Sequence, residues 1–415
     1  MMKTRPLAIL LERVMFVWKI PSFPVLFLLN TIFGLTMSFF APFSSIFGID
    51  EAGMSNGAFG IFMTITAIGG VVISSFIAKK SDTNLSRKRI LILSAAAGII
   101  GYILYAYLRN YWALTLAGFF VLGTSSAALP QLWAYARDVL RKNGIRQEDT
   151  PLVMNIFRMF FALAWTVGPA FGAWLLHITG FQGLFLSVAG GYILALAAII
   201  FLLKDIDSSG KVEQGPIEVK KFLVKPHIFG NLAAAFLLST AFSIHMLNVP
   251  QFVTKVLDGT EIQVGIIFSV APVFEVPMMI IVGMLATKMD VAILIRIGFT
   301  LAFVYFFLFV FVTEPWHIYP LQVISAAQVS ITAGIAISYF QDFMPDAPGT
   351  ATTLYMNTTQ IGSTAGYLLF GFISEVISYG QLIIIYTILA AAGVLFLFLF
   401  GRQKVLDTGR NNLPM

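Results

Sequence analysis

The chain has 415 residues, of which 58% are hydrophobic and only 11% are charged, and its mean hydropathy is +0.87. A water-soluble protein of this length does not need so apolar a composition, so these values exclude a soluble globular fold and indicate a membrane protein with several spans. The formal net charge is +6, and the sequence contains no cysteine, which excludes disulfides and thiolate metal sites.

Apolar runs long enough to cross a bilayer follow one another along the chain, separated by short polar stretches. A transmembrane helix needs about 20 such residues, whereas a barrel strand needs only about 10 and alternates with polar residues. The twelve runs lie at 22–47, 55–78, 90–108, 111–136, 151–176, 183–203, 228–254, 262–287, 291–312, 317–341, 351–376 and 381–401. The sequence therefore predicts an all-α membrane protein with twelve transmembrane helices.

The positions of Lys and Arg predict the orientation of these spans. If the N-terminus is cytoplasmic, 23 of the 26 Lys and Arg residues lie on that side, which leaves Arg109 and Lys255 outside and Arg158 within a span. Cytoplasmic loops of membrane proteins carry such an excess, so we expect both termini in the cytoplasm. The positive net charge is then a topology signal and gives no reason to expect a nucleic-acid partner. Glu12 and Arg13 interrupt the apolar start of the chain, so we expect an uncleaved first span and no signal peptide.

The longest polar stretch, residues 204–227, divides the spans into two groups of six. We expect a domain at 1–203, a cytoplasmic linker at 204–227, and a domain with a short tail at 228–415. Weak repeats at near-constant spacing support two related halves, as in many secondary transporters. Their members are Ala78-Lys-Lys-Ser-Asp82 with Ala286-Thr-Lys-Met-Asp290, at an offset of 208, and Asn155-Ile-Phe-Arg158 with Asn357-Thr-Thr-Gln360, at an offset of 202.

The fifth predicted span contains the least expected residue of the chain, Arg158. A charge near the middle of a membrane helix costs about 2.5–3.5 kcal/mol on insertion scales, so it should face a partner or a water-filled cavity. Trp165 and Gly172 follow at spacings of seven and fourteen, so at 3.6 residues per turn they share roughly the face of Arg158. This face is a candidate functional surface.

Several stretches together resemble one family. The basic loop Ala78-Lys-Lys-Ser-Asp82 to Arg87-Lys-Arg89 and the sequence Gly168-Pro-Ala-Phe-Gly172 are similar to signatures of the major facilitator superfamily. Five further stretches resemble its bacterial sugar efflux transporters: Pro130 to Arg137, Arg158 with Ala164 to Pro169, Phe274 to Pro277, Tyr339 to Pro345, and Gly349 to Asn357. Two features depart from the pattern: the fourth span lacks the mid-membrane arginine of many proton-coupled members, and the basic loop lacks the glycine after its aspartate.

A transporter of this kind needs one central site with polar groups from both halves. Arg158 and Glu275 are the two opposite charges deep in the predicted spans, one in each half, and the resemblance implies that their spans pack near the interface between halves. We expect them to couple substrate movement to protons; the alternative is a permanent ion pair that only fixes helix packing. The candidate substrate-binding residues are Asn30, Gln131, Arg158, Trp165, His245, Asn248, Glu275, Gln328, Tyr339 and Asn357. For each of them, a hydrogen bond that merely joins helices is the alternative.

Four residues are expected to act in gating. Gly168, Pro169 and Gly172 allow close helix approach and a kink in the fifth span. From the resemblance, Asp82 is expected to lie at the positive N-terminus of the eleventh span and hold the cytoplasmic side closed.

The sequence contains no HExxH and no phosphate-binding glycine loop, so we expect no enzyme, no cofactor and no metal. The expected function is export of sugars across the bacterial cytoplasmic membrane, by a monomer, in exchange for protons. Efflux of drugs or other metabolites by the same fold is the alternative, and a membrane scaffold or sensor is a third possibility.

Overall fold

The computed structural model describes residues 16–81, 86–146, 150–205, 225–286, 288–344 and 347–400. Within these ranges the chain is almost entirely helical and forms no strand. The first group of helices comprises α2 (Phe23–Phe40), α3 (Asn56–Ser81), α4 (Arg87–Tyr107), α5 (Tyr111–Leu116), α6 (Gly123–Ser125), α7 (Ala128–Lys142) and α8 (Thr150–Leu202). Short 3-10 or π turns join some of them: η1 (Ala41–Phe43), η2 (Ile46–Glu51) and η3 (Ala117–Leu122).

The second group of helices follows residues 206–224, which lie outside the described ranges. It comprises α10 (Pro226–Lys255), α11 (Glu261–Ala286), α12 (Val291–Phe309), the 3-10 turn η4 (Pro315–His317), α13 (Ile318–Asp342), α14 (Pro348–Ser374) and α15 (Tyr379–Phe400). The all-α membrane fold expected from composition is therefore confirmed.

Ten helical stretches in the described part of the chain are long and apolar enough to cross a membrane. One of them belongs to α8, whose 53 residues would measure about 80 Å if straight, far more than a bilayer needs. The helix is broken at Gly180, where φ is 65° and ψ is −174°, so α8 consists of two helices. The 27-residue helix α14 is not among the ten, because polar residues interrupt it. The count of twelve spans stays a prediction, which this break and the length of α14 support.

Polar residues at loop ends fix where several helices begin. The side chain of Asn110 accepts a hydrogen bond from the backbone N–H of Ala113 (3.1 Å), and that of Asp290 accepts one from Ala292 (2.8 Å). These are N-caps, which satisfy backbone donors that the first helical turn leaves free.

Glycines allow the closest contacts inside the first group. A Cβ atom at Gly168 would lie 1.7 Å from Oγ of Ser38, and one at Gly172 would lie 2.7 Å from the carbonyl oxygen of Phe39. Both contacts join α8 to α2, so these two glycines serve packing within the group. Pro169, between them, presents its carbonyl oxygen to Gly265 of α11 in the other group.

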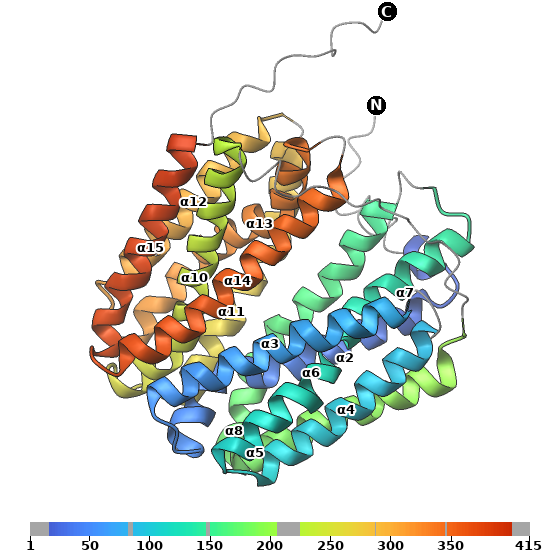
Figure 1. Ribbon diagram of the computed structural model, residues 1–415, viewed down its shortest axis with the longest axis horizontal. Coiled ribbons are helices and arrows are strands. Elements are labelled where there is room, and N and C mark those ends of the chain that lie inside the picture. Colours follow the sequence, from blue (N-terminus) through green and yellow to red (C-terminus); the bar gives the residue numbers. More distant parts are fainter. Residues whose placement is uncertain are drawn as a thin grey trace, which may run out of the picture.

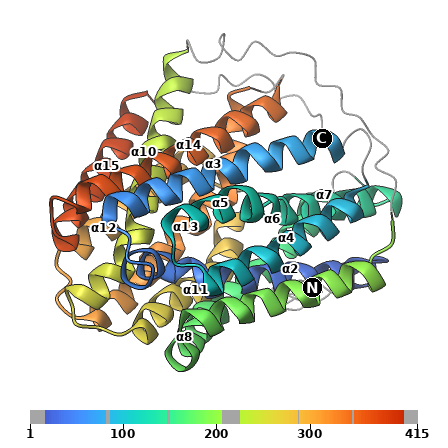
Figure 2. The ribbon, with the colours of Figure 1, turned by 60° about the horizontal axis from the view of Figure 1, so that its bottom comes forward.

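The two groups meet along α3 with α14 and along α8 with α11. Figures 1 and 2 show α3 and α14 side by side. Gly60 and Gly371 let α3 and α14 touch, because a Cβ at Gly60 would lie 2.7 Å from Cα of Gly371. In the second pair, Ala170 donates its N–H to Oγ of Ser269 (3.0 Å). All these contacts lie toward one end of the molecule, which we call the closed end; the other is the open end.

Candidate functional site

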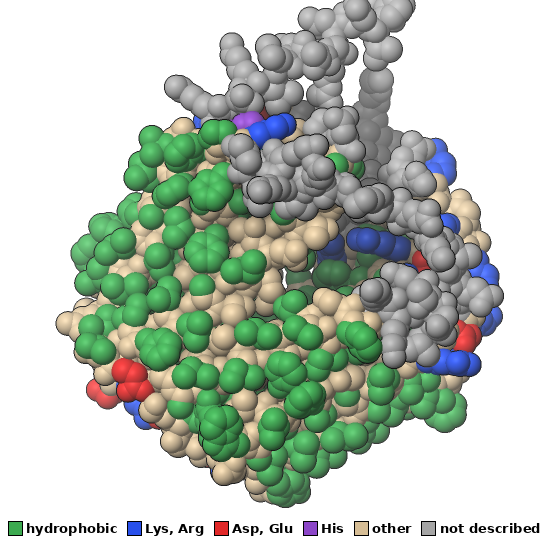
Figure 3. All heavy atoms as spheres, viewed as in Figure 1, with side chains coloured by type: hydrophobic (Ala, Val, Ile, Leu, Met, Phe, Trp, Pro, Cys, Tyr) green, Lys and Arg blue, Asp and Glu red, His purple; other side chains and the backbone are tan. Residues whose placement is uncertain are grey.

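Away from the closed end, the two groups leave a hollow between them. Figure 3 shows this hollow, with Lys or Arg side chains inside it. Its walls are formed by the helices that touch at the closed end. Toward the open end the same faces of these helices no longer touch, so the residues there line the hollow. Arg158 and Trp165 on α8, Glu275 on α11 and Asn357 on α14 occupy such positions.

Arg158 and Trp165 lie on the face of α8 between its contact with α2 and its contact with α11. Gly168 and Gly172 mark the first contact, and Ala170 and Ala173 mark the second. With about 100° per residue, Arg158 and Trp165 fall between these two lines. Both are only half-buried, so the face that the sequence predicted is turned toward the hollow.

The guanidinium of Arg158 lies over the ring of Trp133 on α7, 5.1 Å from the ring centroid. Among the described residues, its buried Nε has no hydrogen-bond partner, and neither has the indole Nε1 of Trp165. A charge in this position is held by a cation–π contact, which supplies no acceptor for its N–H groups. Two N–H groups at this wall of the hollow are thus left without an acceptor among the described residues.

Asn30 holds Trp133 in place from the side. It accepts a hydrogen bond from Nε1 of Trp133 (3.1 Å) and donates one to the carbonyl oxygen of Phe157 (2.7 Å). Asn30 is fully buried, so it joins α2, α7 and α8 and presents no free group to the hollow. One face of the Trp133 ring is covered by Arg158, which leaves Trp165 as the better candidate for stacking on a ligand.

Glu275 lies near the middle of α11, on the side opposite its most exposed apolar residues, among them Val273 and Ile280. Its backbone carbonyl accepts a hydrogen bond from Ser330 of α13 (3.1 Å). Among the described residues its carboxylate forms no ion pair. The antiparallel register of α8 and α11, set by the Ala170–Ser269 contact, places Glu275 roughly opposite residue 164. Arg158 is then about 1.7 turns nearer the open end, and no ion pair joins it to Glu275 in this structure.

His245 lies inside the second group and not at the hollow. Its Nε2 is 3.0 Å from the hydroxyl of Tyr305, and its ring contacts those of Phe306, Phe309 and Tyr386. Asn248, three residues on, is fully buried and donates to the carbonyl oxygen of Tyr379 (3.0 Å) at the start of α15. Both residues join α10 to its neighbours.

The polar face of α13 is also turned into the second group. Gln328 is 0% exposed, and Tyr339 donates to Oδ1 of Asn231 on α10 (2.8 Å). Gln131 of α7 accepts a hydrogen bond from Arg87 (3.1 Å), whose guanidinium also pairs with Asp138 near the open end. None of these three side chains is free to reach the hollow in this conformation. Asp82 lies outside the described residues.

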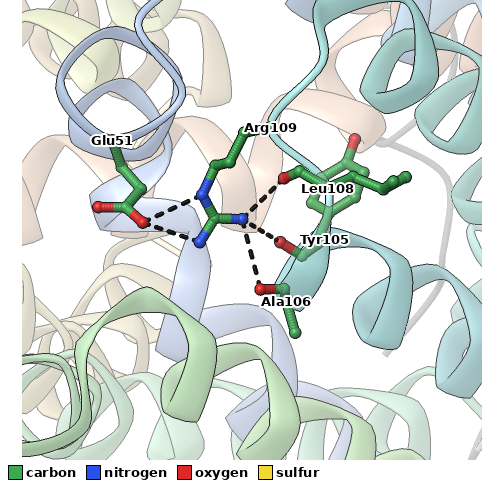
Figure 4. Close-up of polar contacts among 5 residues, drawn as sticks. All are labelled: Glu51, Tyr105, Ala106, Leu108 and Arg109. Atoms are coloured by element: carbon green, nitrogen blue, oxygen red, sulfur yellow. Dashed lines mark hydrogen bonds and ion pairs between the residues drawn. The ribbon is translucent and has the colours of Figure 1, made fainter.

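Sequence analysis missed a set of polar contacts at the closed end. Figure 4 shows Arg109 after the end of α4, donating to Glu51 (2.8 and 3.0 Å) and to the carbonyl oxygens of Tyr105, Ala106 and Leu108. The guanidinium thus satisfies carbonyls that the helix end leaves free and fixes the η2 turn.

The next acidic residue, Asp50, connects the two groups. Its carboxylate is 2.9 Å from Nζ of Lys255 and accepts a hydrogen bond from Gln251 (3.0 Å), both on α10. Arg109 and Lys255 are the two basic residues that the topology placed outside, and the adjacent acids Glu51 and Asp50 bind them. The presence of opposite charges in the predicted outer loops was the sequence feature that could have predicted these ion pairs.

Three more bonds join α3 to the end of α14 and the start of α15. Asn56 donates to the carbonyl oxygen of Ser374 (2.8 Å) and accepts from the hydroxyl of Tyr379 (3.1 Å). The N–H of Gly57 donates to the carboxylate of Glu375 (2.7 Å), which lowers the pKa of that carboxyl group, with a further contribution from Ser55. We call the contacts of Asp50, Asn56 and Glu375 the closed-end lock.

Comparisons with known proteins agree with this geometry. The family model described as Major Facilitator Superfamily matches residues 26–367. A Deinococcus radiodurans protein that carries the name of a sugar efflux transporter is 31% identical over 365 residues, which cover 86% of this chain and 92% of that protein. Sugar efflux transporter C of Escherichia coli is 29% identical over 353 residues, covering 84% and 88%.

Solved structures of low sequence identity share the fold. The nucleoside transporter NupG has a TM-score of 0.73 at 13% identity, covering 92% of this chain and 100% of that one. A bacterial homologue of the human lysosomal transporter Spinster, in an inward-facing and occupied conformation, has a TM-score of 0.71 at 11% identity, covering 94% and 98%. At such identities the similarity concerns the fold alone.

Proposed function

Because this chain belongs to the major facilitator superfamily, we propose that it exports sugars or sugar-like small molecules by alternating access of one central site. The site is the hollow, and the observation that carries the proposal is that polar side chains from both groups, without ion pairs among the described residues, line it. Arg158 and Trp165 contribute from α8, Glu275 from α11 and Asn357 from α14. Hydroxyls of a sugar both donate and accept hydrogen bonds, so they suit donors on one wall and acceptors on the other.

The domain boundaries and orientation form part of the proposal. The two halves are residues 1–203 and 228–415, joined by 204–227, and the protein acts as a monomer in the bacterial cytoplasmic membrane. Among the described residues, the open end carries most of the Lys and Arg residues, so the positive-inside rule favours a cytoplasmic position for this end. The hollow then admits substrate from inside the cell, and opening of the closed-end lock releases it outside.

Exchange for protons is the proposed driving reaction. Arg158 and Glu275 lie on opposite walls and form no ion pair with any described residue, and closing the open end would bring their helices together. A carboxylate that alternates between an aqueous hollow and a closed contact experiences two environments with different proton affinities. Glu275 is thus the proposed proton carrier, and Arg158 is the charge that competes with its proton.

Uptake into inverted membrane vesicles tests this function. Vesicles that contain the protein should accumulate radiolabelled glucose, galactose or lactose when their interior is made acidic, and should do so less without the pH gradient. Vesicles with the Glu275→Gln variant are the matched control. Accumulation of a hydrophobic dye with no sugar uptake would favour drug efflux, and sugar uptake that ignores the pH gradient would exclude proton exchange.

A further inference from the structure

The helix α14 carries a polar stripe in the middle of the membrane. Thr353, Asn357, Gln360 and Thr364 follow one another at spacings of four, three and four, which places them on one face. Asn357 and Gln360 are exposed and lie near the middle of the helix. The stripe thus places polar side chains midway along a helix of membrane-spanning length.

The contacts of α14 show where the stripe points. Gly371, seven residues beyond Thr364 and hence on the same face, touches Gly60 of the first group. The opposite face packs on α10, because a Cβ at Gly362 would lie 2.6 Å from the carbonyl oxygen of Phe236. The stripe therefore faces the first group across the hollow, on the face by which α14 touches α3 nearer the closed end.

Among the described residues, Asn357 and Gln360 are the two members of the stripe whose side chains make no hydrogen bond. The hydroxyls of Thr353 and Thr364 donate to carbonyl oxygens of their own helix, at Gly349 and Gln360 (both 2.9 Å). In the part of the chain that the structure describes, the side-chain amides of Asn357 and Gln360 have no hydrogen-bond partner. Each amide has a carbonyl acceptor and two N–H donors, and residues three apart on a helix have Cβ atoms about 5–6 Å apart.

We propose that Asn357 and Gln360 form an amide pair that binds hydroxyl groups of one sugar ring and so determines which sugars are accepted. This inference rests on the proposed function and adds the specificity-determining residues to it. An amide that donates to and accepts from the same hydroxyl rejects an analogue in which hydrogen replaces that hydroxyl, because its buried groups are then left unpaired. The pair recognises neutral polyhydroxylated substrates, whereas a hydrophobic drug offers it nothing.

Transport of deoxy sugars by reconstituted full-length protein tests the inference. The probes are glucose, galactose and lactose, followed by each monodeoxy derivative of whichever is transported. For one derivative, the wild type should show a kcat/KM about 2- to 12-fold below that of the parent sugar, as expected for one hydrogen bond between neutral groups. The variants Gln360→Met and Asn357→Leu keep the side-chain volume roughly constant. In one of them, the ratio of kcat/KM for the parent sugar to kcat/KM for this derivative should fall to about one.

A ratio within a single preparation is insensitive to how much variant protein has folded. Thr359→Val is the matched control: it removes a hydroxyl on the same helix that donates to its own carbonyl at Met356 (2.9 Å), and its ratios should equal those of the wild type. If both amide variants slow parent and deoxy sugars equally, the pair does not read hydroxyls and the inference is wrong. If the wild type transports none of the three sugars, the proposed function itself fails.

Discussion

Asp50 of the first group and Lys255 of the second form an ion pair of 2.9 Å across the end where the two groups meet. The next residue, Glu51, pairs with Arg109 of its own group, which holds the η2 turn against α4. The turn thus has one carboxylate fixed to its own group and another bound to the opposite group. Asp50 can leave Lys255 without any rearrangement of the turn, as a reversible contact requires.

Loss of the Asp50 contact should open the closed end. Asp50 is 30% and Lys255 51% exposed, so the pair contributes about 0.2–1 kcal/mol. Because the protein has no cysteine, Thr364→Cys provides a unique label in the hollow. In that background, Asp50→Asn should raise the rate of labelling by an impermeant thiol reagent from outside the cell about 1.4- to 5-fold. Arg141→Gln, which removes an ion pair with Asp138 near the open end, is the control and should leave the rate unchanged.

The contact between α3 and α14 should not tolerate a side chain at Gly371. A Cβ there would lie 2.8 Å from Cα of Gly60, and backbone cannot yield as a flexible side chain does. Overpacking of this kind costs about 1–3 kcal/mol, so Gly371→Val should raise outside labelling of Thr364→Cys about fivefold or more. Gly283→Val introduces the same side chain on α11 where nothing lies within 4 Å of the new Cβ. Equal labelling in the two variants would contradict a steric role for Gly371.

Acid should weaken the lock through Glu375. The N–H of Gly57 binds the carboxylate form and lowers its pKa from the ordinary 4.5. A lowered pKa means that the stabilisation is fully present above about pH 4.5 and is lost as the pH falls through the lowered value. Distances between spin labels on Trp112→Cys and Trp316→Cys, exposed residues on the two groups, should stay constant above that pH and lengthen below it. With Glu375→Ala the distance should be longer at neutral pH and respond less to acid.

Sequence reasoning predicted the local features of this fold and fewer of the long-range ones. Helix positions follow from hydropathy, and a common face for Arg158 and Trp165 follows from the helical period. The period also places Gln328 and Tyr339 on one face, but it does not say which neighbour that face meets. In the structure Tyr339 bonds to Asn231 of α10, and Gln328 is fully buried. In a nearly apolar helix, the face toward lipid and the face toward the protein core are both hydrophobic. The sequence therefore does not show which face of the helix is buried in the protein.

Arg158 and Glu275 form no ion pair in this conformation. This absence decides what a double substitution of the two residues should do to stability. Arg158→Gln and Glu275→Gln should each lower sugar transport at least about tenfold, as each removes a charge from the hollow. Without direct contact, their effects on the free energy of unfolding should add within about 0.3–0.5 kcal/mol. Thermal unfolding of both single variants and the double variant measures this. A double variant more stable than additivity allows would show that the two charges pair in a substantial part of the population.

His245 should matter for stability and not for proton coupling. Its ring packs among Tyr305, Phe306, Phe309 and Tyr386, so His245→Ala leaves a cavity that should cost about 2–5 kcal/mol. His245→Phe fills the space and removes the 3.0 Å contact with the hydroxyl of Tyr305, which keeps its hydrogen bond from Gln322 (3.1 Å), so the cost should be about 0.5–1.5 kcal/mol. Because the ring does not reach the hollow, the pH dependence of sugar uptake by His245→Phe should match that of the wild type, whereas Glu275→Gln should flatten it. A flattened pH profile in His245→Phe with an unchanged unfolding midpoint would instead place this histidine on the proton path.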